Sequence, residues 1–372
     1  MKMDNLINKR VKAMNVSGVR KMFEMASKMK DPIDLSLGLP DFDVPSEVKK
    51  GAIEAIKKGL NRYTPTTGIK ELKQEVLKKL REKNNIDVNE NKLIITSAGS
   101  GALSIIFTTI INEGDEIIIN EPYFVSYREL IIQNGGIPVY VKTKKDFSLD
   151  LNELKNKITN KTKAIVINSP NNPTGQVYDE KELKQLVILA KKNNVLIISD
   201  EIYEDFCYEK KHFSVASIYP NTVTINGFSK SHAMTGWRVG YCVGPEEIIQ
   251  EAVKVQQFNF VCAPTPFQHA AIRALNCKID DYVKKYKIKR DLIFNGLKKK
   301  YNIVKPEGAF YAFIEYPYGP EDFVNECLKN NLLIVPGSAF SRNNTHFRIS
   351  FANKDKELEK AVKILNEIVN KK

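Results

Sequence analysis

The chain has 372 residues, of which 42% are hydrophobic and 27% charged, and this composition is typical of a globular protein with room for two domains. The net charge of +13 is spread over the whole chain, so we predict solvated helix faces and no nucleic-acid partner. No apolar run could span a bilayer and the polar start lacks a signal-peptide core, so the sequence predicts a cytoplasmic protein without a membrane partner.

The cysteines and histidines indicate neither disulfides nor a metal. The five cysteines are an odd number and are widely spaced, which favours buried thiols over disulfides. The four histidines show no metal-ligand spacing, so we predict no metal site.

Seven short apolar runs rich in isoleucine and valine alternate with helical stretches. The runs are continuous rather than alternating, which is typical of strands buried on both faces of a mostly parallel sheet. They cover residues 92–96, 116–120, 137–142, 164–168, 195–200, 223–226 and 239–244. The clearest helix, residues 180–192, has apolar residues at positions 183, 186, 187 and 190. The sequence therefore predicts an α/β fold, a mostly parallel seven-stranded sheet flanked by helices.

The two ends of the chain depart from this pattern. The start reads as a polar helix followed by an extended stretch, and beyond a helical region near residues 246–300 the strand and helix signals weaken. We predict an N-terminal segment (1–40) that packs on the small domain or on a partner, a large domain (41–275) and a smaller α+β domain (276–372) to which both chain ends contribute.

Polar segments directly follow five of the predicted strands. In open α/β sheets ligands bind at the carboxyl ends of the strands, so we expect these segments to converge on one cleft. They are residues 97–101, 121–127, 168–175, 200–203 and 227–230.

The first segment, Ser97 to Gly101, follows a strand and opens a helix, so its backbone amides suit a phosphate group. A plain glycine turn explains it nearly as well. Gly99, Gly101 and Ser104, with Glu121 about 20 residues later, also half match a dinucleotide fingerprint. An NAD-dependent dehydrogenase is therefore an alternative, although the third glycine is missing.

Lys230 lies within the segment Gly227 to Gly240, eight residues before Arg238. A lysine that attacks a carbonyl must be partly unprotonated, and a neighbouring cation lowers its pKa. Arg238 would supply that charge while binding a phosphate. A solvated surface lysine is the alternative, but glycine, serine and arginine at fixed offsets favour a Schiff-base lysine.

Asp200 ends a predicted buried strand, where an unpaired carboxylate is costly. It therefore needs a cation, and either a protonated pyridine nitrogen or a structural salt bridge would serve. The loop from Asn168 to Gly175 is dense in turn-forming residues, and an ordinary loop explains most of its composition.

Together these segments resemble the class I aminotransferases, of the aspartate and aromatic aminotransferase type, among the fold type I pyridoxal-phosphate enzymes. The resemblance runs from about Val16 to the last helix, and Gly227 to Gly240 is its most specific part. Six further motifs appear in the family's order: residues 38–42, 63–68, 122–127, 171–175, 200–203 and 347–350.

The resemblance implies that pyridoxal 5'-phosphate is held as an aldimine on Lys230, which then moves the proton of the substrate α-carbon. Asp200 would keep the pyridine nitrogen protonated. Tyr203 and Asn172 would hydrogen-bond the ring oxygen, and Phe124 would stack on the ring face.

The resemblance also implies the residues around the phosphate and the substrate. The Gly99 and Ser100 amides, with Arg238, would bind the phosphate, and Tyr63 would reach the phosphate of the neighbouring subunit in a homodimer. Gly227 stands where some members place a phosphate-binding serine. On the substrate side, Arg348 would bind the α-carboxylate through two parallel hydrogen bonds of its guanidinium group. The Gly38 backbone and the Asn172 amide would assist it.

The implied activity is an aminotransferase that moves the amino group between an L-amino acid and a 2-oxo acid, with glutamate and 2-oxoglutarate in one half-reaction. Residues 256–267 contain no basic residue, so we expect an apolar or permissive side-chain pocket, with aspartate also possible. Arg20 is the remaining candidate for a second carboxylate, and an exposed helix charge is its alternative.

Other reactions at the same cofactor stay open, namely those of a β-lyase, a decarboxylase or a synthase. A DNA-binding regulator on this fold is disfavoured, because residues 1–40 are too short and too unlike a helix-turn-helix.

Overall fold

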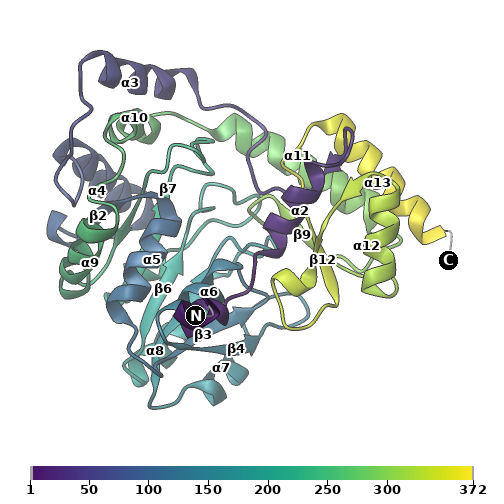
Figure 1. The fold of residues 1–372 in the computed structure, drawn as a ribbon, viewed down its shortest axis with the longest axis horizontal. Coiled ribbons are helices and arrows are strands. Elements are labelled where there is room, and N and C mark those ends of the chain that lie inside the picture. Colours follow the sequence, from purple (N-terminus) through teal and green to yellow (C-terminus); the bar gives the residue numbers. More distant parts are fainter. Residues whose placement is uncertain (1–2, 371–372) are drawn as a thin grey trace.

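A seven-stranded sheet forms the centre of the molecule in the computed structural model, which describes residues 3–370 (Figure 1). Its strand order is β2-β8-β7-β6-β5-β3-β4. All neighbours are parallel except β8, which runs antiparallel to both β2 and β7. The strands are β2 (Leu93–Thr96), β3 (Glu116–Glu121), β4 (Ile137–Lys142), β5 (Thr162–Asn168), β6 (Leu196–Asp200), β7 (Thr222–Gly227) and β8 (Gly240–Val243). The predicted α/β fold and its mostly parallel sheet are confirmed.

Helices cover both faces of this sheet, which explains why the strands are continuously apolar. Ile117 and Ile119 of β3 pack towards α5, whereas Ile118 between them packs in the cluster of α7 and α8. Helix α8 begins after an Asp179–Glu182 capping box and buries residues 183, 186, 187 and 190, the predicted positions. The helices are α3 (Ser46–Lys57), α4 (Lys70–Asn84), α5 (Ala98–Ile110), α6 (Ser126–Gln133), α7 (Leu151–Lys157), α8 (Glu180–Lys192), α9 (Glu246–Asn259) and α10 (Thr265–Leu275).

A second, smaller unit lies beside the sheet, drawn in green, yellow-green and yellow in Figure 1. Its three-stranded sheet has the order β11-β12-β9 and is antiparallel. The elements are α11 (Asp280–Leu297), β9 (Tyr311–Glu315), α12 (Pro320–Lys329), β10 (Leu332–Leu333), β11 (Val335–Pro336), β12 (His346–Ser350) and α13 (Asp355–Asn370). Near the start of the chain, β1 (Ile33–Asp34) pairs in parallel with β10. The N-terminal segment therefore joins this unit, while the boundaries at residues 40 and 275 stay predictions.

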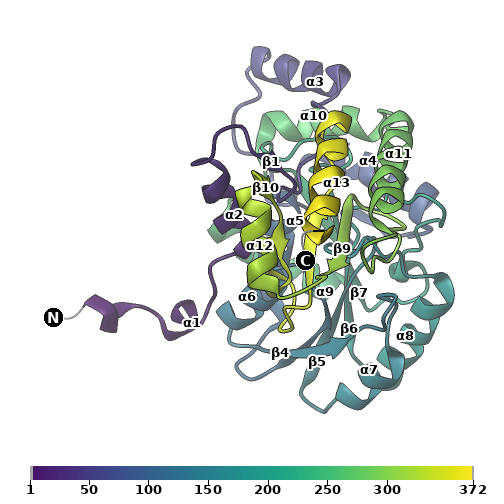
Figure 2. The ribbon, with the colours of Figure 1, turned by 90° about the vertical axis from the view of Figure 1, so that its right-hand side faces the viewer.

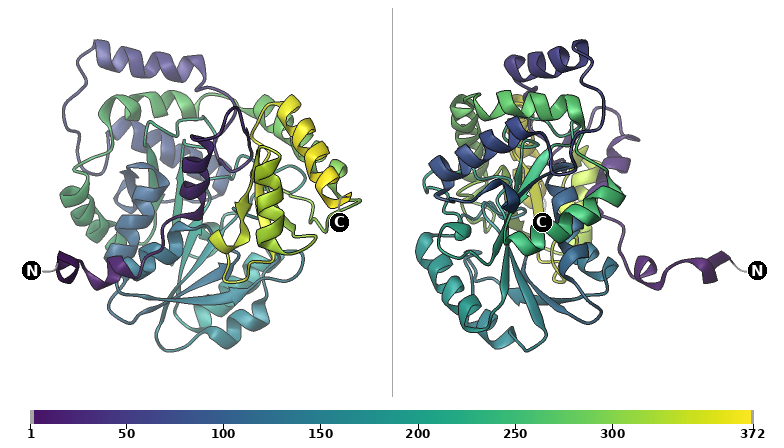
Figure 3. Two further views of the ribbon diagram at one scale, coloured as in Figure 1. Left: turned by 45° about the vertical axis from the view of Figure 1, so that its right-hand side comes forward. Right: turned by 90° about the vertical axis from the view of Figure 1, so that its left-hand side faces the viewer.

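The first described residues project from the body of the molecule, as Figures 2 and 3 show. This arm holds η1 (Met3–Leu6) and α1 (Lys9–Lys12), and an ion pair between Arg10 and Glu113 ties it to the large sheet's loops. Helix α2 (Gly18–Ala26) follows and lies against β11. None of the helices in residues 3–370 has the length and apolar character needed to cross a membrane. The five cysteines are free thiols; Cys242 and Cys327 are buried as predicted, whereas Cys207, Cys262 and Cys277 are only partly buried.

Candidate active site

The polar segments at the strand ends converge on one cavity of about 800 Å³. The parallel strands β5, β6 and β7 end at the same edge of the sheet, and this brings their loops together. Ten of the eleven predicted site residues line it: Gly38, Gly99, Ser100, Phe124, Asn172, Asp200, Tyr203, Lys230, Arg238 and Arg348. The eleventh, Tyr63, is 82% exposed and does not line the cavity of its own chain.

Lys230 reaches into this cavity from the loop after β7. Its Nζ donates a hydrogen bond to the Gly38 carbonyl oxygen at 2.7 Å. Burial, together with the nearby Arg348 and Arg238 guanidinium groups, lowers the pKa of Lys230 to about 8, against the opposing charge of Asp200. A substantial fraction of the amine is therefore neutral at physiological pH, as a nucleophile or a base requires.

Asp200 ends β6 with its carboxylate buried at 5% exposure. The Tyr127 hydroxyl donates to it at 2.7 Å, and sequence reasoning gave Tyr127 no role. Burial raises the pKa of Asp200 to about 6 in spite of this hydrogen bond. Within the described part of the chain Asp200 forms no salt bridge, so its carboxylate can pair with a cationic group of a ligand.

The N-terminus of α5 forms an anion-binding end of the cavity with Arg238. The Arg238 guanidinium donates to the Ser100 hydroxyl at 2.7 Å and to the Thr235 carbonyl at 2.8 Å. The first amides of a helix lack intrahelical partners and point at such a ligand. A Cβ at Gly240 would lie 2.8 Å from the Gly99 nitrogen, so only glycine lets β8 approach the helix start this closely.

Gly227 has no space for a side chain, because a Cβ there would lie 2.9 Å from the Gly240 Cα. This packing explains why glycine stands at this position. Ser229 lines the cavity two residues further on.

Arg348 lies on β12 and is only 2% exposed. Its guanidinium carbon lies 4.6 Å from the ring centre of Tyr311 and 4.7 Å from that of Phe340. It donates to the Asn172 Oδ1 atom at 3.0 Å and to the Ser36 carbonyl, whereas its Nε has no hydrogen-bond partner. The buried cation therefore keeps an unused donor, which suits a carboxylate ligand.

Tyr203 and Tyr311 meet at the wall of the cavity, with their hydroxyl oxygens 2.8 Å apart. Tyr311 belongs to β9 of the smaller unit, and the sequence offered no signal for it because the contact depends on how the two units dock. Both tyrosines line the same cavity as Lys230.

The rest of the lining is mainly apolar and includes one exposed arginine. Arg20 lies in α2 at the mouth, with its side chain 69% exposed and an ion pair to Glu24 at 3.6 Å. The apolar lining residues are Val19, Leu37, Leu39, Leu103, Val125 and Ile202.

Glu121 does not lie in this cavity. Its buried carboxylate accepts hydrogen bonds from the Ser341 hydroxyl at 3.1 Å and from the Arg342 backbone and guanidinium groups. The acid that a dinucleotide fingerprint would need for a ribose is thus already paired and lies outside the cavity, which disfavours the dehydrogenase alternative.

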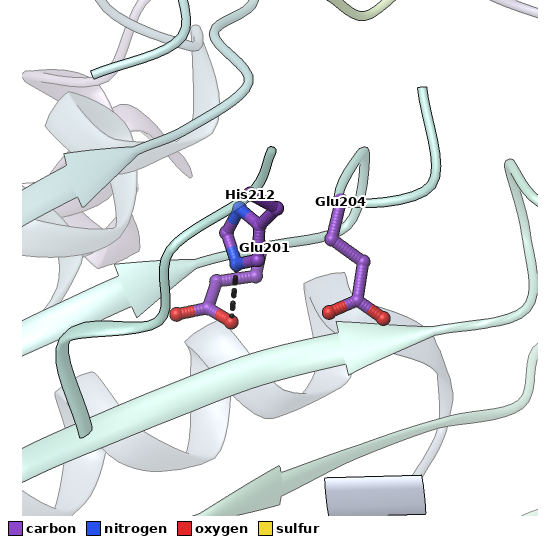
Figure 4. A group of neighbouring side chains, drawn as sticks. All are labelled: Glu201, Glu204 and His212. Carbon is purple, nitrogen blue, oxygen red and sulfur yellow. Dashed lines mark hydrogen bonds and ion pairs between the residues drawn. The ribbon is translucent and has the colours of Figure 1, made fainter. Parts of the chain in front are cut away.

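A second polar cluster lies on the other side of residues 200–204, and Figure 4 shows three of its side chains. We call Lys79, Glu201, Glu204 and His212 the buried ion-pair network. His212 Nε2 lies 2.9 Å from a Glu201 carboxylate oxygen, and Lys79 forms an ion pair with Glu204. Burial alone would raise the pKa of Glu204, but Lys79 and Lys83 hold it at about 2.

The acids and the histidine of this network have ligand atoms within 4.8 Å of one another, a spacing compatible with a metal. The Lys79 ammonium group already neutralises Glu204, and its charge would repel a metal cation. The network is therefore accounted for by its own ion pairs, and the absence of a metal site stays a prediction.

Comparison with known proteins agrees with the geometry. The family model described as aminotransferase class I and II matches residues 30–365. A probable aspartate aminotransferase of Methanocaldococcus jannaschii is 40% identical over 98% of this chain and 100% of its own length. An aromatic-amino-acid aminotransferase 2 of Thermococcus litoralis is 35% identical over 98% of this chain and 99% of its own length.

A solved structure is similar over nearly the whole fold. The aspartate aminotransferase of Thermus thermophilus, solved with maleate, superposes with a TM-score of 0.92 at 35% identity, covering 97% of this chain and 99% of that one.

Proposed function

The chain belongs to the aminotransferase class I and II family and is a pyridoxal-phosphate-dependent aminotransferase, and from this premise we propose the roles that its own residues play. The observation that carries the proposal is that Lys230, Asp200 and Arg348 line one cavity. The reaction moves an amino group from an amino acid to a 2-oxo acid.

The donor set of the cavity fits this cofactor. The buried Asp200 carboxylate forms no salt bridge among the described residues and would pair with the pyridine nitrogen. Arg238 with the Gly99 and Ser100 amides would hold the phosphate. Phe124 would cover the ring face, and Tyr203 with Asn172 would bind the ring oxygen.

When bound, pyridoxal phosphate supplies an electron sink that weakens the bonds at the substrate α-carbon. Arg348 binds the substrate carboxylate and thereby orients the α-carbon. Lys230, whose amine has a pKa lowered to about 8 by burial and the nearby arginines, would act as the base that takes the α-proton. Beside the cofactor, the Asp200 carboxylate would stay ionised and would stabilise a protonated ring nitrogen.

The same chemistry could end in other products, and a product assay decides. Purified enzyme is given an amino donor and a 2-oxo acid, and the new amino acid is measured beside ammonia and carbon dioxide. We expect the new amino acid with little ammonia, whereas stoichiometric ammonia or carbon dioxide would mark a β-lyase or a decarboxylase.

We propose that glutamate and 2-oxoglutarate serve one half-reaction and that the side-chain pocket is apolar or permissive. The lining residues Leu37, Leu39 and Val19 support an apolar partner. Arg20 in the same cavity supports a second carboxylate, and the Thermus relative was solved with the dicarboxylate maleate. Steady-state kinetics over a panel of donors, with the Arg20→Ala variant, tests this; an aspartate preference that survives the substitution excludes Arg20 as the determinant.

We also propose that the enzyme is a homodimer in which Tyr63 reaches the phosphate of the neighbouring site. Tyr63 is 82% exposed and Phe258 is 86% exposed, which is unusual for such large side chains. Gln256 and Thr265 hydrogen-bond the carbonyls of residues 66 and 62, so the Tyr63 loop lies beside the end of α9. These features support an apolar face that a second copy would cover.

Mixing two inactive variants tests the shared site. In a Lys230→Ala and Tyr63→Ala hybrid dimer one site carries both changes and the other carries neither. We expect activity to return on mixing and light scattering to give a dimer mass. If the mixture forms dimers but recovers no activity, the proposal that Tyr63 contributes to the neighbouring site is wrong.

A cytoplasmic location completes the proposal, because five free thiols suit a reducing compartment. Cell fractionation followed by detection of the chain tests it.

A further inference from the structure

Tyr311 contacts two residues to which the proposed function gives roles, Tyr203 and Arg348, and the backbone of Gly38. Its hydroxyl lies 2.8 Å from the hydroxyl of Tyr203. Its ring lies 4.6 Å from the Arg348 guanidinium carbon. A Cβ built on Gly38 would lie 2.2 Å from the Tyr311 hydroxyl, so the Gly38 backbone, whose carbonyl binds Lys230, lies directly against it.

The backbone around Tyr311 is held by both units of the protein. Ala309 donates to the Phe206 carbonyl at 2.9 Å, and Gly308 donates to the Gly175 carbonyl at 2.8 Å. Within the small sheet Tyr311 pairs with Ser350, two residues from Arg348 on the same strand. Tyr311 is 1% exposed, so its hydroxyl has a fixed position.

Either tyrosine could donate the hydrogen bond between the Tyr203 and Tyr311 hydroxyls. A third group that accepts from Tyr203 would decide which one does. The Tyr203 hydroxyl has one proton, and if it donates that proton to the cofactor ring oxygen, its own oxygen can only accept. Tyr311 is then the donor in the 2.8 Å contact. A donor that is itself hydrogen-bonded in this way becomes a stronger donor.

We propose that Tyr311 is a positioning residue of the reaction, which orients the Tyr203 hydroxyl towards the cofactor ring oxygen and braces Arg348 from the same ring. The inference rests on the proposed role of Tyr203. It goes further, because it ties cofactor tuning and substrate binding to one side chain of the small unit.

The test is a pH titration of the visible absorption band of the bound cofactor in Tyr203→Phe, Tyr311→Phe and the double variant. A hydrogen bond to the ring oxygen favours the ionised cofactor, so its loss moves the titration midpoint upward. We expect a large upward shift in Tyr203→Phe, a smaller one in Tyr311→Phe and no additional shift in the double variant. The kcat/KM of Tyr311→Phe should fall about three- to tenfold, the effect of one lost hydrogen bond.

Tyr301→Phe is the matched control. Tyr301 is also buried in the aromatic core of the small unit, its hydroxyl donates to the Leu365 carbonyl at 2.6 Å, and it does not line the cavity. It should leave the midpoint unchanged even if it lowers the thermal stability.

Each outcome decides one point. A midpoint in Tyr311→Phe equal to that of the wild type, with a shift in Tyr203→Phe, would show that Tyr311 is merely structural. An unchanged midpoint in Tyr203→Phe itself would overturn the proposed role of Tyr203 and this inference with it. An extra shift in the double variant would mean that Tyr311 does not act through Tyr203.

Discussion

The segment from Asp200 to Glu204 contributes carboxylates to two regions, and the pKa shifts of these carboxylates have opposite directions. Asp200 and Tyr203 line the catalytic cavity, whereas Glu201 and Glu204 belong to the buried ion-pair network on the other side (Figure 4). Burial raises the pKa of Asp200 to about 6, while Lys79 and Lys83 hold that of Glu204 at about 2 against the same effect. Two carboxylates four positions apart in the chain thus have pKa values shifted in opposite directions.

The difference teaches which charges serve function and which serve the fold. In the network each buried charge has a partner of opposite sign within the protein, so its desolvation is offset. In the cavity Asp200 and Lys230 influence each other's charge but form no salt bridge among the described residues, so each depends on a ligand for a close partner. Changes in the cavity should therefore remove activity and keep stability, and changes in the network should do the reverse.

The largest expected effect is that of Lys230→Ala, which should lower kcat/KM by about four orders of magnitude or more, because it would remove both the proposed covalent attachment and the proposed general base. The free energy of unfolding should change little, since the substitution relieves a buried amine beside Arg238 and Arg348. Enzyme kinetics and urea unfolding of the cofactor-free protein measure the two quantities. Residual activity within tenfold of wild type would contradict the assignment.

Lys79→Met should lower the free energy of unfolding by roughly 3–5 kcal/mol, because it leaves the Glu204 carboxylate buried without its main partner. The kcat of the folded fraction should stay near that of wild type. Lys83→Met is the control: its side chain is 46% exposed, so it should cost about 1 kcal/mol or less. A large loss of kcat in Lys79→Met, without unfolding, would show that the network takes part in catalysis.

Arg348→Lys comes next, with an expected rise in KM of about 10- to 100-fold for the amino acid, because an ammonium group cannot reproduce the planar fork on a carboxylate. Stability should fall modestly through lost contacts with Tyr311 and Phe340. Arg342→Lys, at the Glu121 ion pair outside the cavity, is the matched control and should keep the KM. Equal KM values in both variants would place the carboxylate elsewhere.

Much of the large sheet, its helices and the cavity was predictable from the sequence, because the signals for them lie in short stretches of the chain. The buried positions of α8 follow from helical spacing, and the convergence of residues 97–101, 168–175 and 227–230 follows from parallel strands ending at one edge. These inferences need only the order of elements along the chain.

The contacts that escaped prediction join residues far apart in the chain. Tyr203 and Tyr311 are 108 residues apart, and Asn84 lies 120 residues from Glu204, to which it donates a hydrogen bond. Such pairs depend on how the small unit and α4 dock on the sheet, and no periodicity or motif encodes that docking. For this reason the network and Tyr311 emerged only from the structure.

The smallest expected effect concerns the pH at which the cofactor-free enzyme takes up pyridoxal phosphate. Since burial and the Arg348 and Arg238 charges lower the pKa of Lys230 to about 8, the amine is protonated below that pH and neutral above it. The rate at which the visible band forms after cofactor addition should therefore rise with pH and level off above about 8.

Arg348→Gln removes one of the two cations, so more of Lys230 stays protonated at neutral pH. We expect its midpoint to move upward and its uptake at pH 7 to slow by about two- to fivefold. Arg342→Gln, outside the cavity, should leave the midpoint in place. A wild-type midpoint near 10.4, the ordinary pKa of lysine, would mean that the cavity does not lower the pKa of Lys230. The difference between unpaired charges in the cavity and paired charges in the ion-pair network would then be smaller than the geometry implies.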